Sequence, residues 1–260
     1  MSVVTLTRNA SSARLCINRP EQRNALSNQV LAELRAGLRE VREDRDVRCL
    51  ILEGAGDRAF CAGGDLSQMN STDGDALDAH LGRSQLAGLF RDLWELGKPT
   101  IARVQGYALA GGFGLALACD LLVASEQAVF GVPEVGVGLW PYMITVPLLH
   151  AMQPKQALRL MLTGCRVSAQ EAADLGFVTE VVQHEDLDLA VDRLAAQIGK
   201  ASPQAVRLGR TTFYSVLNTD VDARLRMLEA SLTVNLGLPD AREGAAAFAA
   251  GRPPAWQVTT

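Results

Sequence analysis

The sequence lacks the features that would place this chain in a membrane or on a nucleic acid. No apolar stretch reaches about 18 residues without a charge or a glycine or proline break, so no membrane-spanning helix is expected. The 25 basic and 29 acidic residues give a net charge of −4, and blocks of like charge are missing. This balance gives no sign of the basic surface that binds nucleic acids or anionic membranes.

The sequence also lacks the patterns of a disulfide framework, a metal site or a signal peptide. Its cysteines are odd in number and form no C-x-x-C pair, which favours buried free thiols in a reducing compartment and therefore a cytoplasmic protein. The histidines lie far apart, so no metal site is expected. The first residues carry no basic region followed by an apolar run, so no signal peptide is expected.

What is present is a mixed α/β pattern over 260 residues, enough for one large core with an appendage. Strand pairs alternate with helices to about residue 185, and helices alone follow. We predict a compact core over residues 1–200 and a helical part over 201–260. The helical part is either an oligomerisation or lid element, or it packs on its own core.

Local patterns predict individual elements. Ser27 is placed to cap a helix over Asn28–Glu43, whose apolar residues recur at helical spacing. Further expected elements are a hairpin (3–7 and 13–17), strands over 49–53, 100–105, 121–125, 128–131 and 177–182, a turn over 106–112, helices over 84–96, 113–119, 169–175, 188–199 and 204–217, a helical region starting at 147–151, and a helical tail over 221–250. The polar stretch 67–82 is expected to be a loop or a frayed helix.

Two glycine turns, Cys61–Asp65 and Ala110–Gly112, are candidates for binding a negative oxygen. Glycine lets the backbone approach a ligand and exposes its N–H groups, and a helix N-terminus adds partial positive charge. Neither turn matches G-x-G-x-x-G or contains a P-loop lysine, so nucleotide phosphate fits poorly. The alternative for each glycine segment is an ordinary turn with only a structural role.

Glu134 is the candidate acid/base. It follows Pro133 in the apolar segment GVPEVGVGLW, where partial burial would raise its pKa towards a value useful for proton transfer. The alternative is a turn residue facing solvent.

Several motifs in order resemble the enoyl-CoA hydratase/isomerase family of the crotonase superfamily. They are residues 18–26, the two glycine turns with 101–120 and 130–138, residues 162–178, and residues 242–248. The resemblance implies a spiral of ββα turns with a helical C-terminal trimerisation part, and a homotrimer or hexamer. It also implies acyl-CoA thioesters as substrates, with coenzyme A as part of the substrate and no further cofactor.

Carried over by position, the resemblance assigns an oxyanion hole to the backbone N–H groups of Gly64 and Gly111. It assigns the lining of the coenzyme A channel to Ala25, Ala62 and Leu66, and an acid/base role to Glu134. Further acyl-pocket residues would be Gly114, Trp140 and Tyr142, with Tyr142 a candidate auxiliary polar group and simple packing the alternative.

One departure from the family bears on the reaction. The family's hydratases use two glutamates; the first falls on Gly114, which has no side chain, and the second on Glu134. Family membership favours hydration of 2-enoyl-CoA, which we place first; the missing acid favours Δ3,Δ2-enoyl-CoA isomerisation. Decarboxylation or dehalogenation, with Gly114 leaving room for a bulkier substrate, and a non-catalytic acyl-CoA binder are further alternatives.

Overall fold

The strands of this chain form two β-sheets. The computed structural model describes residues 2–65 and 76–257, and for 76–83 the backbone alone. The larger sheet has the order β1 (Val4–Asn9), β2 (Ser12–Ile17), β3 (Cys49–Gly54), β5 (Thr100–Val104), β7 (Leu121–Ser125), β10 (Glu180–Val182). The smaller sheet has the order β4 (Ala59–Cys61), β6 (Tyr107–Leu109), β8 (Val129–Gly131), β9 (Arg166–Ser168). Except for β1–β2 and β8–β9, neighbouring strands are parallel.

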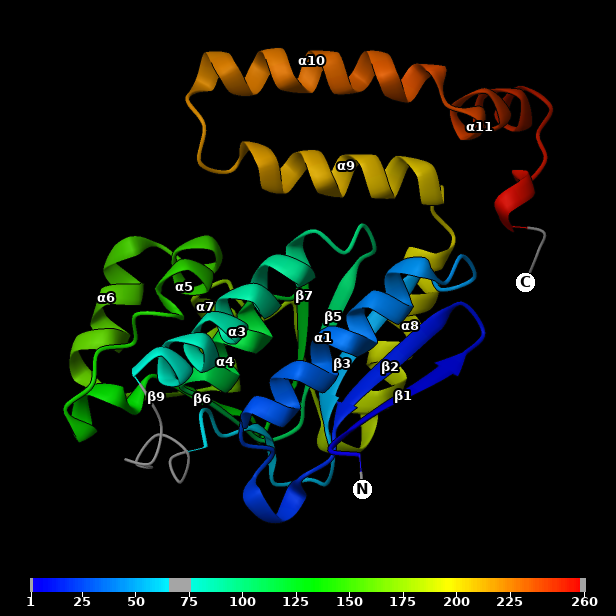
Figure 1. Ribbon diagram of the computed structural model, residues 1–260. Helices are drawn as coiled ribbons and strands as arrows, with labels where there is room; N and C mark the ends of the chain where they lie inside the picture. Colours follow the sequence, from blue (N-terminus) through cyan, green and yellow to red (C-terminus); the bar gives the residue numbers. More distant parts are fainter. Residues whose placement is uncertain (1, 66–75, 258–260) are drawn as a thin grey trace.

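The helices complete a spiral (Figure 1). In its three middle turns, which begin at β3, β5 and β7, one strand in the larger sheet is followed by one in the smaller sheet and then by a helix. The helices are α1 (Asn28–Glu43), α3 (Ala76–Trp94), α4 (Gly111–Leu117), α5 (Thr145–Ala151), α6 (Pro154–Thr163), α7 (Ala169–Asp174), α8 (Leu187–Gly199), α9 (Pro203–Val216), α10 (Val221–Gly237) and α11 (Pro239–Ala249). Short 3₁₀ turns are η1 (Pro20–Gln22), η2 (Pro133–Val137), η3 (His184–Asp186) and η4 (Ala255–Gln257). The expected spiral of ββα turns is confirmed.

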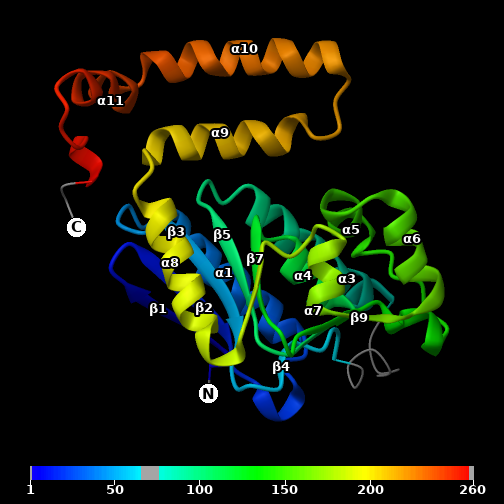
Figure 2. The same cartoon turned by 180° about the vertical axis from the view of Figure 1, so that it is seen from behind.

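Helix α4 lies at the centre of the core. Its residues from Gly112 to Leu117 are all buried. The Phe113 ring packs on those of Phe130 and Phe177, with centroids 5.5 and 5.2 Å away. On the other face of the larger sheet, α8 covers a second apolar cluster, to which Leu187 and Val191 contribute (Figure 2). The candidate active site, which begins at α4, is therefore built on a rigid element.

The C-terminal helices lie along one end of this core (Figure 1). Helix α9 contacts α10, and α10 itself has no buried residue. Apolar side chains on these helices are exposed, among them Leu225, Leu232 and Leu236 at 57–66%. The expected continuous tail is in fact two helices, because Pro239 cannot continue α10 and instead begins α11.

Some predicted elements are confirmed and others need correction. The helix over Asn28–Glu43 is confirmed, with the Ser27 Oγ accepting a hydrogen bond from the Val30 N–H. The predicted turn over 106–112 contains strand β6, and the predicted strand over 177–182 begins only at Glu180. The predicted loop or frayed helix over 67–82 lies partly outside the described residues, and α3 begins at Ala76. All five cysteines are free; Cys49, Cys61 and Cys119 are buried as expected, whereas Cys16 and Cys165 are only partly buried. In the described part of the chain, no helix is long and apolar enough to cross a membrane.

Candidate active site

Three neighbouring parallel strands of the smaller sheet end at one edge and deliver the three candidate catalytic groups. Gly64 follows β4, Gly111 follows β6 and Glu134 follows β8. The register pairs Cys61 with Ala108, and Leu109 with Gly131, so the strands end at similar heights. Adjacent strands lie about 4.8 Å apart. Ligands of open parallel sheets commonly bind outside this carboxyl edge.

The Gly64 N–H is left without a partner by the way its segment pairs. Leu26 and Gly64 form a parallel bridge. In this bridge the Leu26 N–H donates to the Gly63 carbonyl over 2.8 Å, and the Asp65 N–H donates to the Leu26 carbonyl over 3.0 Å. These bonds use the Gly63 carbonyl and the Asp65 N–H, so the N–H of Gly64 itself points away from Leu26. Among the described residues this N–H has no acceptor.

The Gly111 N–H also has no acceptor in the described part of the chain, for a different reason. Gly111 is the first residue of α4, and the first N–H groups of a helix have no acceptor within it. Its position is fixed because the Ala110 N–H donates to the Gly131 carbonyl over 3.0 Å. Ala110 has φ 49° and ψ −128°, a conformation that costs a non-glycine residue about 1–3 kcal/mol. No local sequence pattern indicates this strain, which lies directly beside the candidate donor.

The two glycine turns lie against each other. A Cβ built on Gly111 would stand 3.9 Å from the Gly64 nitrogen, and one built on Gly63 would stand 3.5 Å from the Gly111 nitrogen. A Cβ on Gly112 would stand 2.7 Å from the Cys61 carbonyl carbon, so only glycine lets α4 begin this close to β4. The arrangement can present two N–H donors to one oxygen atom, as an oxyanion hole does.

Glu134 supplies a partly buried carboxyl group at the same edge. It lies in η2, directly after Pro133. Its Oε2 atom is buried and accepts no hydrogen bond from the described part of the chain. Burial raises the pKa of Glu134 above its usual value. The carboxyl group thus has the environment of a proton carrier, as the apolar segment around it suggested.

Gly114 does not open a space, contrary to the expectation of room for a bulkier substrate. A Cβ at Gly114 would stand 2.8 Å from the Ile144 Cβ and 3.3 Å from the Phe90 Cζ, and closer still to the Ile144 Cγ2. Both side chains are buried, with exposures of 2% for Ile144 and 3% for Phe90. Neither was predicted for the site, because their contact with Gly114 joins segments distant in sequence.

Two of the three predicted coenzyme A channel residues lie beside the Leu26–Gly64 bridge. The Ala62 N–H donates to the Arg23 carbonyl, and the Ala25 carbonyl accepts a hydrogen bond from Arg19. Two of the predicted residues, Ala25 and Ala62, are therefore brought together next to Gly64. Leu66 lies outside the described residues.

An ion pair and a buried amide hold this loop in place. Arg19 pairs with Asp65 over 3.1 Å, and both side chains are 16% exposed. The fully buried Asn24 side chain accepts from the Arg19 N–H and donates to the carbonyls of Ala55 and Ala59. The loop is thereby tied to the strand region that leads into Gly64.

The two aromatic residues after η2 differ in placement. Trp140 is partly buried and packs against the core. Tyr142 is 76% exposed, and its hydroxyl makes no hydrogen bond with the part of the chain that the structure describes. Trp140 is thus one of the packed side chains, whereas Tyr142 is not.

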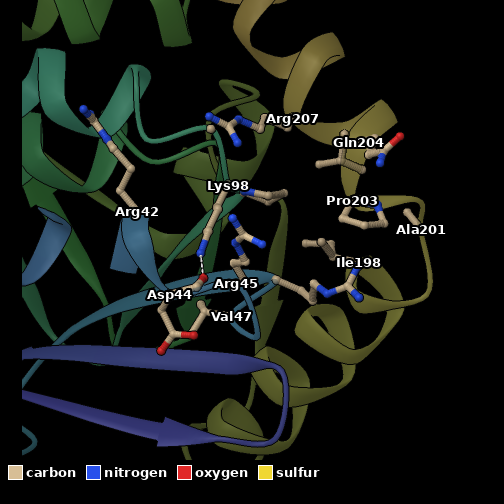
Figure 3. Close-up of a pocket in the computed structure, with 14 residues that line it drawn as sticks. Arg42, Asp44, Arg45, Val47, Lys98, Ile198, Ala201, Pro203, Gln204 and Arg207 are labelled. Atoms are coloured by element: carbon tan, nitrogen blue, oxygen red, sulfur yellow. Dashed lines mark hydrogen bonds between the residues drawn. The ribbon is translucent and has the colours of Figure 1, made fainter. Parts of the chain in front are cut away.

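The cavity shown in Figure 3 lies elsewhere and does not share these residues. It has a volume of about 360 Å³ between the end of α1, the turn at Gly97–Pro99 and the start of α9. The Lys98 ammonium group donates to the carbonyls of Val41 and Asp44, so it caps the last turn of α1. This lysine has a structural role that explains its partial burial.

Comparisons with known proteins agree with the fold. The enoyl-CoA hydratase/isomerase family matches residues 7–259. The chain is 34% identical to the crotonyl-CoA hydratase of Syntrophomonas wolfei over 94% of both chains. It is 34% identical to the carnitinyl-CoA dehydratase of Proteus mirabilis over 97% of both chains. A crystal structure of an enoyl-CoA hydratase from Mycobacterium smegmatis superposes with a TM-score of 0.93 at 32% identity, covering 98% of this chain and 99% of that one. The chain belongs to the enoyl-CoA hydratase/isomerase family of the crotonase superfamily.

Proposed function

We propose that this protein is an enzyme that moves a proton on enoyl-CoA thioesters through an enolate, with Glu134 as its single acid/base. The thioester oxygen accepts hydrogen bonds from the Gly64 and Gly111 N–H groups, which stabilise it as negative charge develops. One such donor typically contributes about 3 kcal/mol in the transition state. The thioester itself takes up the charge.

The site geometry supports double-bond isomerisation best. Glu134 removes a proton from C2 of a 3-enoyl-CoA and returns it at C4, giving the 2-enoyl-CoA with no net gain or loss of atoms. One carboxylate within reach of both carbons is sufficient for this transfer. The observation that carries the proposal is the partly buried carboxyl group of Glu134, combined with Ile144 at the place where a second acid on Gly114 would stand.

Hydration of 2-enoyl-CoA is the second candidate, supported by the named hydratase and dehydratase relatives. It requires a water molecule to be held and deprotonated while C2 is protonated, which two carboxylates do more readily than one. The apolar Ile144 side chain offers no hydrogen bond to such a water. This reverses the order of the two reactions that family membership alone suggested.

The Glu134→Gln variant tests the proposal. The amide keeps the shape of the side chain but cannot accept the proton, so we expect the turnover of 3-enoyl-CoA to fall by at least about a hundredfold. Glu126→Gln, which changes an exposed carboxylate after β7, is the matched control. Full turnover by Glu134→Gln on every enoyl-CoA tried would contradict the role of Glu134.

We propose that residues 201–260 form the oligomerisation part and that the protein is a homotrimer or hexamer in the cytoplasm. The support is the exposed apolar surface of α10 and the family likeness. Light scattering of the purified protein tests the assembly: a monomer at micromolar concentration would contradict it. The free thiols favour a reducing compartment.

A further inference from the structure

Helix α3 contacts α4 at two successive turns beside the candidate oxyanion hole. Gly111 and Gly114 lie on the same face of α4, because residues three apart are neighbours on a helix surface. A Cβ on Gly111 would stand 3.7 Å from the Leu86 Cδ2, and one on Gly114 would stand 3.3 Å from the Phe90 Cζ. The seam between the two helices therefore starts at the Gly111 donor and runs towards Phe90.

Buried side chains block this seam one helical turn beyond the Gly111 N–H donor. Leu86 is half-buried, whereas Phe90 and Ile144 are almost fully buried. From Gly111 to Gly114 the helix rises only about 4.5 Å. An acyl chain that follows the seam, with its thioester oxygen at Gly64 and Gly111, therefore meets Phe90 and Ile144 after one helical turn.

The space behind this barrier is not completely filled. Trp94, one turn after Phe90, packs against it with ring centroids 6.2 Å apart. Trp94, Leu117 and His150 contribute to the lining of a cavity of about 320 Å³. The seam is thus closed by Phe90 and Ile144, of which Ile144 comes from the segment before α5 rather than from α3 or α4.

We propose that Ile144, backed by Phe90, ends the acyl pocket and restricts the enzyme to short-chain enoyl-CoA thioesters. The inference rests on the proposed function, because it takes the thioester oxygen to lie at Gly64 and Gly111. Ile144 is β-branched and has few rotamers, so it cannot swing aside as a flexible side chain would. Its truncation should therefore lengthen the pocket.

The kinetic test compares butenoyl-, hexenoyl- and octenoyl-CoA as substrates of the wild type, Ile144→Val and Ile144→Ala. We expect the ratio of kcat/KM for octenoyl- over butenoyl-CoA to rise at least about tenfold in Ile144→Ala, and by less in Ile144→Val. The control is Ile51→Ala, an equal truncation of a fully buried side chain in the cluster under α8, which should leave the ratio unchanged. An unchanged ratio in the Ile144 variants, or equal wild-type turnover of all three substrates, would overturn the proposal.

A binding test separates this inference from the proposed reaction. Titration calorimetry with saturated butyryl-, hexanoyl- and octanoyl-CoA needs no turnover. We expect wild-type affinity not to increase beyond butyryl-CoA, and the affinity of Ile144→Ala to increase with chain length. A wild type that is inactive on all enoyl thioesters but shows this binding pattern would contradict only the reaction. If affinity depends on chain length equally in the wild type and in Ile144→Ala, the role of Ile144 is overturned. If Ile144→Ala does not fold, Ile144→Val provides the comparison.

Discussion

The Arg210 guanidinium group on α9 donates to the Asp120 Oδ2 over 2.7 Å, and only 7% of the Arg210 side chain is exposed. The Tyr214 hydroxyl donates to the other oxygen of the same carboxylate over 2.5 Å. Arg210 also donates to the carbonyls of Leu93 and Trp94, each over 2.8 Å. Helix α9 is thereby fixed to the core of its own chain, while α10 keeps its apolar surface exposed.

Replacing Arg210 should destabilise the protein strongly. Arg210→Met removes the charge that faces the Asp120 carboxylate, whose side chain is 18% exposed. Breaking a buried ion pair from one side costs about 3–5 kcal/mol, and we expect the lower end because Asp120 is only partly buried. Urea unfolding at a fixed protein concentration measures the change. Arg207→Met, at an exposed arginine one turn earlier on α9, should change the free energy of unfolding by less than about 0.5 kcal/mol. Equal effects of the two substitutions would show that the ion pair does not hold α9.

Ala110 stores backbone strain next to the Gly111 donor. Ala110→Gly should raise the free energy of unfolding by about 1 kcal/mol, because glycine adopts a positive φ without a Cβ clash. The gain is partly offset by the greater freedom of glycine in the unfolded chain. Thermal or urea unfolding checks the stability. A clear loss of stability would mean that the Ala110 conformation is not strained in solution.

The contact between Gly114 and Ile144 predicts a non-additive pair of substitutions. Gly114→Ala alone should cost about 1–3 kcal/mol, because the new methyl group overlaps the Ile144 side chain. In an Ile144→Ala background the same substitution should cost at least about 0.5 kcal/mol less, since the methyl group then enters vacated space. A double-mutant cycle by urea unfolding measures this coupling. Strict additivity would contradict the contact.

Glu134 should make both activity and stability depend on pH. Burial raises the pKa of the folded protein's Glu134 above 4.5. The contribution of this group to stability is therefore complete below the unfolded pKa and is lost as pH rises through the raised folded pKa. Glu134→Gln should be more stable than the wild type near neutral pH, and the difference should vanish at acidic pH.

The same shift predicts the pH profile of the reaction. If the ionised carboxylate removes the C2 proton, kcat/KM should fall on the acidic side through a pKa above 4.5. A profile that is flat on the acidic side, or a Glu134→Gln variant that is less stable at neutral pH, would contradict a buried Glu134 acting as base.

The sequence alone is sufficient to predict the features that local residue patterns determine. The helix from Asn28 to Glu43 was predicted with both ends, because Ser27 is a good N-cap and the apolar residues repeat at helical spacing. Partial burial of Glu134 followed from its apolar neighbours. By contrast, the three-residue strands β4, β6 and β9 are too short to show a periodicity, and β6 lies inside a predicted turn.

The remaining parts of the site depend on contacts between distant segments. Ile144 reaches Gly114 from the segment after η2, and Phe90 reaches it from α3. A glycine in a sequence signals room for a ligand and room for a neighbour equally well, so the extra space expected at Gly114 was wrong. The strain at Ala110 arises from the close approach of two turns, which no local pattern reveals.

The most direct test of the account is mass spectrometry of 3-butenoyl-CoA and 2-butenoyl-CoA incubated with the enzyme in heavy-oxygen water. The account predicts that the two thioesters interconvert without a gain in mass from water, and that Glu134→Gln abolishes the interconversion. A 3-hydroxybutyryl-CoA product carrying the heavy oxygen, formed faster than the isomer, would contradict isomerisation as the main reaction. It would mean that Glu134 alone is enough to hydrate the double bond beside Ile144.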